Sequence, residues 1–151
     1  MKYAHLIKLT AFSYEREDNQ SILDALFGFF PFNLEENKVI LKKTEAAGFN
    51  EKKIMIFEIT TTKEVLINQF LKNLSNNLGE EQKNKILQQI GSRLDKNLDF
   101  FLRFDKDAWI NDKKLILTDS GKCFHIKISV AAFPKKREIA LKLLKNSFSE
   151  K

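Results

Sequence analysis

The stretch LRFDKDAW, Leu102–Trp109, contains the residues whose types and spacing most readily suggest chemistry. Asp105 and Asp107 are two carboxylates that could hold a magnesium ion or act as a general acid and base. Lys106 stands between them, and Arg103 precedes them in an alternating, strand-like run. The stretch therefore has four possible roles: an acidic catalytic pair, a metal site, a basic binding surface or a solvated turn that ends a strand.

The surrounding sequence disfavours catalysis. Alternate residues of a strand point to opposite faces, so Asp105 and Asp107 would diverge, and Lys106 adds a competing positive charge. The two histidines, His5 and His125, each fall in a predicted strand, where a lone histidine is more often structural than catalytic. The sequence has no serine elbow, glycine-rich phosphate loop or two-histidine metal pattern. We therefore expect no enzyme activity, no bound metal and no cofactor.

The composition indicates one globular domain spanning residues 1–151. Hydrophobic residues make up 43% of the chain and charged residues 30%, which is typical neither of a disordered nor of a membrane protein. Cys123 is the single cysteine, so neither a disulfide framework nor a cysteine-based zinc site is expected. The segment MKYAHLIKLTAF is interrupted by Lys8 and has no apolar run typical of a signal peptide or membrane span. A cytoplasmic location is the default expectation.

Positive charge is concentrated near the end of the chain. Lys and Arg number 26 against 20 Asp and Glu, a net charge of +6. Residues 134–151 contain six basic and two acidic residues, a net +4 in this short segment. A localised basic patch favours phosphate-bearing partners, although solubility alone could also explain it.

The periodicity of hydrophobic residues predicts the order strand, helix, two strands, two helices, three strands, helix. We expect an α+β domain in which helices cover one face of a largely antiparallel sheet. Pro31 is expected to end the first helix, and Thr61 with Glu64 forms a capping-box pattern for the second. The predicted strands span residues 3–12, 38–47, 52–60, 98–105, 114–118 and 122–133.

Alternation along the strands predicts a cationic sheet face. In the last predicted strand, Phe124, Ile126 and Ile128 fall on one side, and His125 and Lys127 on the other. Three other predicted strands also place a cation on the side away from the core. If these strands are neighbours, the open face carries Lys8, Lys42, Arg103 and Lys127.

The last helix suggests a second cationic site. Pro134 suits its first position, which places Lys135, Lys136 and Arg137 in the first turn. Positive charge is unfavourable there because of the helix dipole, whereas a phosphate is favoured by the free backbone N–H groups. This cluster predicts a phosphate site, with a tolerated surface cluster as the alternative.

Two motifs resemble an archaeal RNA-binding family described as predicted exosome subunits. Its pattern Arg-Leu-Asp-Lys-Gln-Ala matches at Arg103, Asp105, Lys106 and Ala108. Its second pattern, Tyr-Pro-Ala-Lys-Arg-Glu, matches at Pro134, Lys136, Arg137 and Glu138, with Phe133 in place of Tyr. The segment AHLIKLTAF followed by Glu17 and Asp18 is similar to the family's opening strand and helix start. Asp107 replaces the family's Gln, and only Gly48 and Asn50 match its hairpin loop, which leaves the 48–51 loop without an assigned role.

The resemblance implies a fold similar to the ribosomal protein that binds 5S rRNA. It implies a non-enzymatic RNA-binding protein for structured or ribosomal-type RNA, with an exosome or other RNA-processing proteins as further partners. We expect a central strand that ends at Asp105, with Arg103 and Lys106 on the binding side. Asp105 would orient one of these cations or cap the following turn. The alternative function is an adaptor whose basic face binds an acidic protein.

Overall fold

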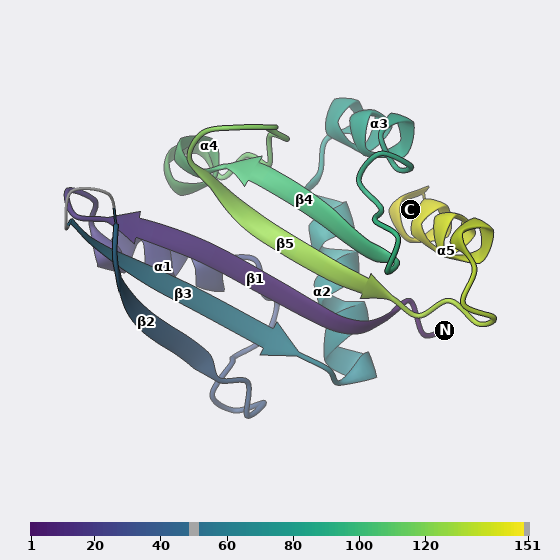
Figure 1. Cartoon of the computed structure of the whole chain (residues 1–151), viewed down its shortest axis with the longest axis horizontal. Coiled ribbons are helices and arrows are strands. Elements are labelled where there is room, and N and C mark those ends of the chain that lie inside the picture. The colour runs from purple at the N-terminus through teal and green to yellow at the C-terminus, as the bar shows by residue number, and fades with distance from the viewer. Residues whose placement is uncertain (49–51, 150–151) are drawn as a thin grey trace.

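The chain folds into a five-stranded antiparallel sheet, as seen in a computed structural model that describes residues 1–48 and 52–149 (Figure 1). The strand order across the sheet is β2-β3-β1-β5-β4. This arrangement confirms the α+β prediction. The strands are β1 (Ala4–Tyr14), β2 (Leu41–Ala47), β3 (Lys53–Thr61), β4 (Asp99–Asp105) and β5 (Cys123–Val130).

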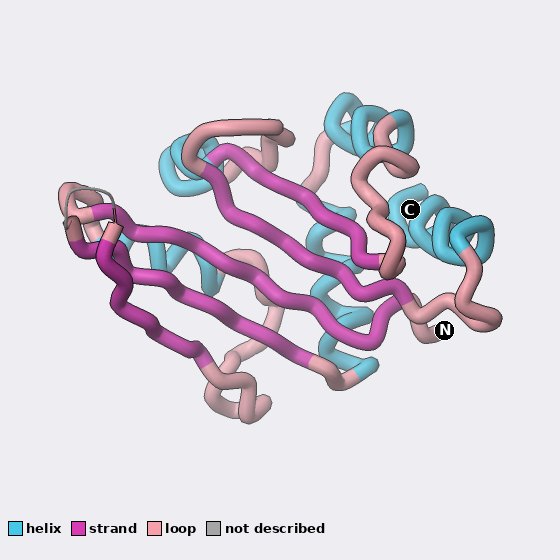
Figure 2. Tube along the Cα trace, viewed as in Figure 1, coloured by secondary structure: helices cyan, strands magenta, loops and turns pink. Residues whose placement is uncertain are grey.

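The helices leave one face of the sheet uncovered. In Figures 1 and 2, α1 and α2 lie behind the sheet, and α3 and α5 lie together at its right-hand end. α2 and α3 are the two consecutive helices that the periodicity predicted, and both contact α5. None of the helices within the described residues is long and apolar enough to cross a membrane. The helices are α1 (Asn19–Phe27), α2 (Glu64–Asn77), α3 (Glu80–Gln88), α4 (Lys106–Asp112) and α5 (Arg137–Ser149).

Alternating strand residues fill the core between the sheet and the helices. Phe124, Ile126 and Ile128 of β5 are at most 1% exposed. Phe29, just after α1, packs its ring against Trp109 at 4.8 Å and Phe124 at 5.4 Å between centroids. Aromatic burial of this kind is a large stabilising contribution, and it fixes which face of the sheet is closed.

The stretch that opened the sequence analysis is a strand joined directly to a helix. Asp105 ends β4, and its Oδ2 accepts a hydrogen bond from the backbone N–H of Ala108 at 2.9 Å. This bond confirms that Asp105 caps the following turn. The turn continues as α4, which the sequence analysis did not predict. Trp109 anchors α4 to α1, because its Nε1–H donates to the carbonyl of Ala25 at 2.7 Å.

The position of β4 differs from the prediction. It is an edge strand, not a central one, because it stands last in the strand order and, among the five strands, pairs only with β5. Residues 114–118 were expected to form a strand, but Leu117 makes only an isolated bridge to Phe104. Lys113 ends α4 in the left-handed conformation, and the chain then runs along the outer edge of β4.

Two helix boundaries also differ from the prediction. The first helix ends at Phe27, with Gly28 as its C-cap, and so stops before Pro31. The second begins at Glu64 with Lys63 as its N-cap and no side-chain capping bond, so the proposed capping box is not formed. Residues 49–51 of the predicted hairpin loop lie outside the described residues, although β2 and β3 pair as expected.

Candidate nucleic-acid interface

Four of the predicted cations lie on the open face of the sheet. Lys8 and Lys127 are register partners on the adjacent strands β1 and β5. Arg103 on β4 is the partner of His125, and Lys42 on β2 is the partner of Glu58. The prediction that these strands bring their cations to one face is therefore correct. The four cations come from four different strands, so the positive charge is spread across the width of the sheet.

Two of these lysines are held in ion pairs. The ammonium of Lys8 lies 3.0 Å from Glu58 Oε2, and that of Lys127 lies 3.7 Å from Asp99 Oδ2. Both lysine side chains remain 39% exposed. Ion pairs with this degree of solvent access contribute little stability, about 0–1 kcal/mol. The carboxylates therefore orient the two lysines but hold them weakly, so another anion can replace a carboxylate at little cost in free energy.

Three of the four cations, Lys8, Arg103 and Lys127, line a shallow hollow of about 330 Å³ over β1, β5 and β4. The His125 ring stands edge-on to Phe12, with centroids 5.6 Å apart. Burial lowers the pKa of His125, and the positive charges of Arg103 and Lys106 lower it further. The imidazole is therefore neutral at physiological pH, and the charge of the hollow comes from lysine and arginine. Its lining includes Lys8, Thr10, Phe12, Phe101, Arg103, His125 and Lys127.

Lys106 is not on this face, and the prediction that it lies on the binding side is wrong. Its side chain is 1% exposed. The ammonium donates to the carbonyl of Phe12 at 2.6 Å and to the Glu17 carboxylate at 3.1 and 3.3 Å, and it lies 5.3 Å from the Tyr14 ring centroid. Lys106 therefore ties α4 to the end of β1. A continued strand would also have turned this side chain to the covered side, because position 106 is two residues after the buried Phe104, so the prediction went against the strand alternation itself.

The basic cluster before the last helix also differs from the prediction. The helix α5 starts at Arg137, so Lys135 and Lys136 precede it instead of occupying its first turn. Both lysines are exposed. Arg137 donates from Nη1 to the carbonyl of Leu94 at 3.0 Å and from Nη2 to the carbonyl of Gly91. Its guanidinium thus connects α5 to the segment before β4, although the residue, like the two lysines, remains exposed.

The groups with nucleophilic or metal-binding potential are placed for structural roles. Asp105 caps α4, and burial raises the pKa of the Cys123 thiol, which keeps it protonated. Cys123 Sγ lies 3.5 Å from His125 Nε2. Across residues 1–48 and 52–149, the structure contains no group of three or more acidic, histidine or cysteine side chains arranged to hold a metal ion.

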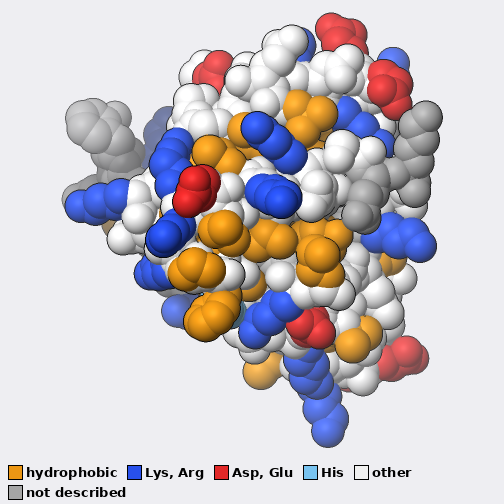
Figure 3. Space-filling view, turned by 90° about the vertical axis from the view of Figure 1, so that its right-hand side faces the viewer, with side chains coloured by type: hydrophobic (Ala, Val, Ile, Leu, Met, Phe, Trp, Pro, Cys, Tyr) orange, Lys and Arg blue, Asp and Glu red, His pale blue; other side chains and the backbone are white. Residues whose placement is uncertain are grey.

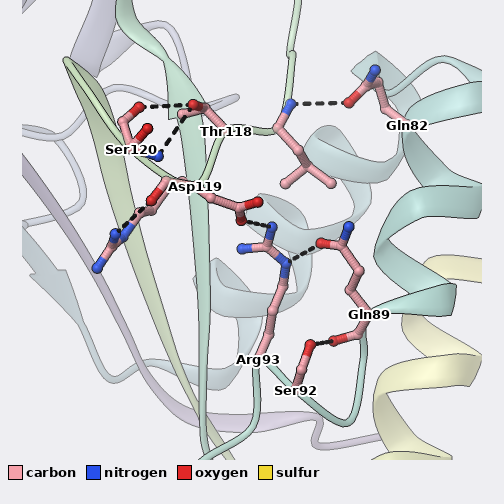
Figure 4. A network of polar contacts seen from close by, with 9 residues as sticks. Gln82, Gln89, Ser92, Arg93, Thr118, Asp119 and Ser120 are labelled. Atoms are coloured by element: carbon pink, nitrogen blue, oxygen red, sulfur yellow. Dashed lines mark hydrogen bonds and ion pairs between the residues drawn. The ribbon is translucent and has the colours of Figure 1, made fainter.

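A second pocket, which the sequence analysis missed, lies at the outer edge of β4 (Figure 4). Arg93 contributes its guanidinium there, held by Gln89 and Asp119. Arg93 and Asp119 lie in irregular segments and approach one another only through the fold. Hydrophobic periodicity carries no signal for such residues, and an arginine between a helix and the following strand is ordinary on a protein surface.

A family model described as RNA binding matches residues 6–130. The chain belongs to this RNA-binding family. The match covers β2 to β5 and all but the first two residues of β1, and it confirms the family that the resemblance suggested. It includes the first motif, at residues 103–108, whereas the second, at residues 133–138, lies beyond it. Association with an exosome and likeness to the 5S-rRNA-binding ribosomal protein stay predictions.

Proteins similar in sequence and in fold cover nearly the whole chain. An RNA-binding protein of Pyrococcus abyssi is 27% identical over 143 residues, which cover 94% of this chain and 92% of that one. A crystal structure from Archaeoglobus fulgidus has a TM-score of 0.83 at 24% identity, covering 95% of this chain and 99% of that one. A structure from Sulfolobus solfataricus has a TM-score of 0.73 at 26% identity and covers 93% and 98%.

Proposed function

We propose that this protein binds RNA without catalysing its cleavage, and that the open face of the sheet is the contact surface. The observation that carries the proposal is the convergence of Lys8, Lys42, Arg103 and Lys127 on one uncovered face from four strands. A wide face with spaced cations suits the regular spacing of phosphates along a nucleic acid.

The ion pairs on this face favour an exchangeable contact. Glu58 and Asp99 have side chains that are 23% and 19% exposed, and each holds one lysine beside the hollow. An incoming phosphate can replace either carboxylate at small cost, because exposed pairs are weak. Arg103 donates from Nη1 to the carbonyl of Asp119 at 3.2 Å, which fixes its guanidinium while leaving other N–H groups for a ligand.

Lys135 and Lys136 extend the proposed surface beyond the sheet. They follow β5 at the right-hand end of the sheet in Figure 1, just before α5. Figure 3 looks onto this end of the molecule and shows Lys and Arg side chains distributed around a hydrophobic patch, with few acidic groups among them. The proposed contact residues are therefore Lys8, Lys42, Arg103, Lys127, Lys135 and Lys136. Lys106 is excluded because its ammonium is buried against Phe12 and Glu17. Arg137 is left out of this set because its guanidinium holds α5 to the carbonyls of Leu94 and Gly91, although it is exposed and keeps further N–H groups.

The proposed ligand is structured RNA, of the ribosomal type that the family resemblance suggests, with an exosome or other RNA-processing proteins as further partners. Binding should need no divalent metal. Labelled RNA incubated with magnesium or manganese should stay intact, and cleavage that depends on this protein would contradict the non-enzymatic part of the proposal.

A salt titration of RNA affinity tests the binding itself. Phosphate contacts release counterions, so the logarithm of the association constant should fall linearly with the logarithm of salt concentration. Each contact contributes a slope of about −0.7 on single strands and −0.9 on duplexes. The competing function, an adaptor for an acidic protein, would also be salt-sensitive. Pull-down from lysate with and without RNase separates the two, because only an RNA-bridged complex is lost after RNase treatment.

A further inference from the structure

The pocket at the outer edge of β4 has features that the open face lacks. It has a volume of about 550 Å³, and side chains from the end of α3, the segment after it, β4 and the segment after α4 surround it (Figure 4). Polar groups form most of its wall, and one aromatic side chain completes it. The lining residues are Gln89, Ser92, Arg93, Leu94, Asp95, Phe101, Arg103 and Asp119.

The polar groups of this pocket are held in place by one another. Arg93 is 11% exposed in its side chain; its Nε–H donates to Gln89 Oε1 at 2.9 Å, and its Nη2–H donates to Asp119 Oδ1 at 3.1 Å. Arg103 donates to the Asp119 carbonyl at 3.2 Å. Asp119 thus accepts from both guanidinium groups, and Figure 4 shows its carboxylate bonded to Arg93. The donors and acceptors are therefore oriented before any ligand arrives, which lowers the entropic cost of binding.

The charge of the pocket argues for a neutral ligand. The two arginines are balanced by two carboxylates, because Asp95 lies in the wall with Asp119. Asp95 Oδ1 accepts from the backbone N–H groups of Asn97 and Asp99 at 2.9 Å each, so this carboxylate is held by the backbone. A free phosphate would meet this negative charge, and a metal ion would meet the guanidiniums. A flat, uncharged group with its own donors and acceptors fits better.

Phe101 connects this pocket to the open face. Its side chain lines both the pocket and the hollow over β1, β5 and β4, and it is 41% exposed. Arg103 lines both as well. A chain of nucleotides with its phosphates on the lysines of the open face would therefore pass directly over the rim of the pocket. An exposed aromatic ring at such a rim is a stacking surface for a base.

We propose that the pocket at the edge of β4 receives an unpaired nucleobase of the bound RNA, which stacks on Phe101 and meets the polar groups of Arg93, Asp119 and Gln89. The inference rests on the proposed function and adds a ligand class to it: structured RNA with an unpaired nucleotide, such as a bulge or internal loop. A fully paired duplex would use only the lysines of the open face. The pocket thus supplies discrimination between RNA shapes, and the open face supplies general affinity.

Two short RNA hairpins test this inference, one with a fully paired stem and one whose stem carries an internal loop. The wild-type protein should bind the looped hairpin more tightly, by roughly 5- to 100-fold, as stacking of one base on an aromatic ring provides. Phe101→Leu keeps an apolar side chain but removes the ring, and it should erase most of this preference without changing affinity for the paired stem. Phe27→Leu is the matched control, since Phe27 is similarly exposed at 36% but lies on α1, behind the sheet.

A second variant blocks the pocket without altering Phe101. Ser92 is exposed at its wall, so Ser92→Phe should fill the space and remove the preference for the looped hairpin. Equal wild-type binding of both hairpins, or a preference that survives Phe101→Leu and Ser92→Phe, would overturn the base pocket while leaving RNA binding by the open face intact. Equal losses for both hairpins in Phe101→Leu would also overturn it. Failure of the wild type to bind either hairpin would reject the proposed function together with the pocket.

Discussion

Replacement of Lys106 by methionine should destabilise the fold strongly without weakening RNA binding. The ammonium is buried between the Phe12 carbonyl, the Glu17 carboxylate and the Tyr14 ring, and its side chain is 1% exposed. Methionine preserves most of the length and apolar volume of the side chain. The variant therefore removes the charge and its hydrogen bonds with little change in packing.

The expected loss of stability comes from the Glu17 carboxylate, which the variant leaves without its partner. Removal of one partner of a buried ion pair costs about 3–5 kcal/mol, because the other charge stays buried without compensation. Glu17 keeps a side-chain exposure of 17%, so water can relieve part of this penalty. We therefore expect a loss of about 3 kcal/mol, at the lower end of that range. In a chain of this length, such a loss lowers the melting temperature by roughly 6–12 °C.

Urea or thermal unfolding measured by circular dichroism checks this value, and fluorescence anisotropy with labelled RNA checks binding below the melting transition. Adding Glu17→Gln to Lys106→Met should restore part of the stability, since no uncompensated carboxylate is then left. A variant with unchanged stability and weakened RNA binding would refute the reasoning. Such a result would place Lys106 on the contact surface, as the sequence analysis had predicted.

Three further predictions concern the supports of the site. Trp109→Phe should lower the free energy of unfolding by about 1–3 kcal/mol, because the buried carbonyl of Ala25 loses its donor; chemical denaturation measures it. Asp105→Ala should cost about 1 kcal/mol through loss of the α4 N-cap, and thermal unfolding would detect no change if the cap were unimportant. The lowered pKa of His125 means that the unfolded chain binds a proton more readily than the folded one. The contribution of neutral His125 to the free energy of unfolding should therefore be fully present above pH 6.5, the pKa in the unfolded chain, and should decline as pH falls toward the folded pKa. His125→Gln should flatten that decline, which unfolding curves measured across this pH range would show.

Period-two alternation was sufficient to predict the open face. Ile126 and Ile128 had to be buried together, so Lys127 had to point away from the core, and the same reasoning holds for Lys8 between Ile7 and Leu9. This inference needs only strand geometry and a single covered face. It succeeded because the strands are long enough for the alternation to be unambiguous.

The failures occurred where tertiary contacts override local pattern. Lys106 follows a strand in sequence but begins a helix, because Asp105 can cap it and Trp109 can insert beside α1. Arg137 looks like a surface cation, yet its donors meet carbonyls more than forty residues away in the chain. Arg93 could not be identified as part of a pocket for the same reason. Each of these side chains has a role set by a distant backbone segment, which no local pattern encodes.

The most direct test of RNA binding through the open face compares two double variants with equal loss of charge. Lys8→Gln with Lys127→Gln removes two cations from adjacent strands of the open face, whereas Lys142→Gln with Lys145→Gln removes two exposed cations from α5. The measurement is RNA affinity as a function of salt concentration. The open-face variant should bind more weakly, with a salt slope shallower by about 0.7–0.9 for each lost phosphate contact, while the α5 variant stays close to wild type. Equal losses in the two variants, or a larger loss in the α5 variant, would contradict the assignment of the open face as the RNA contact surface.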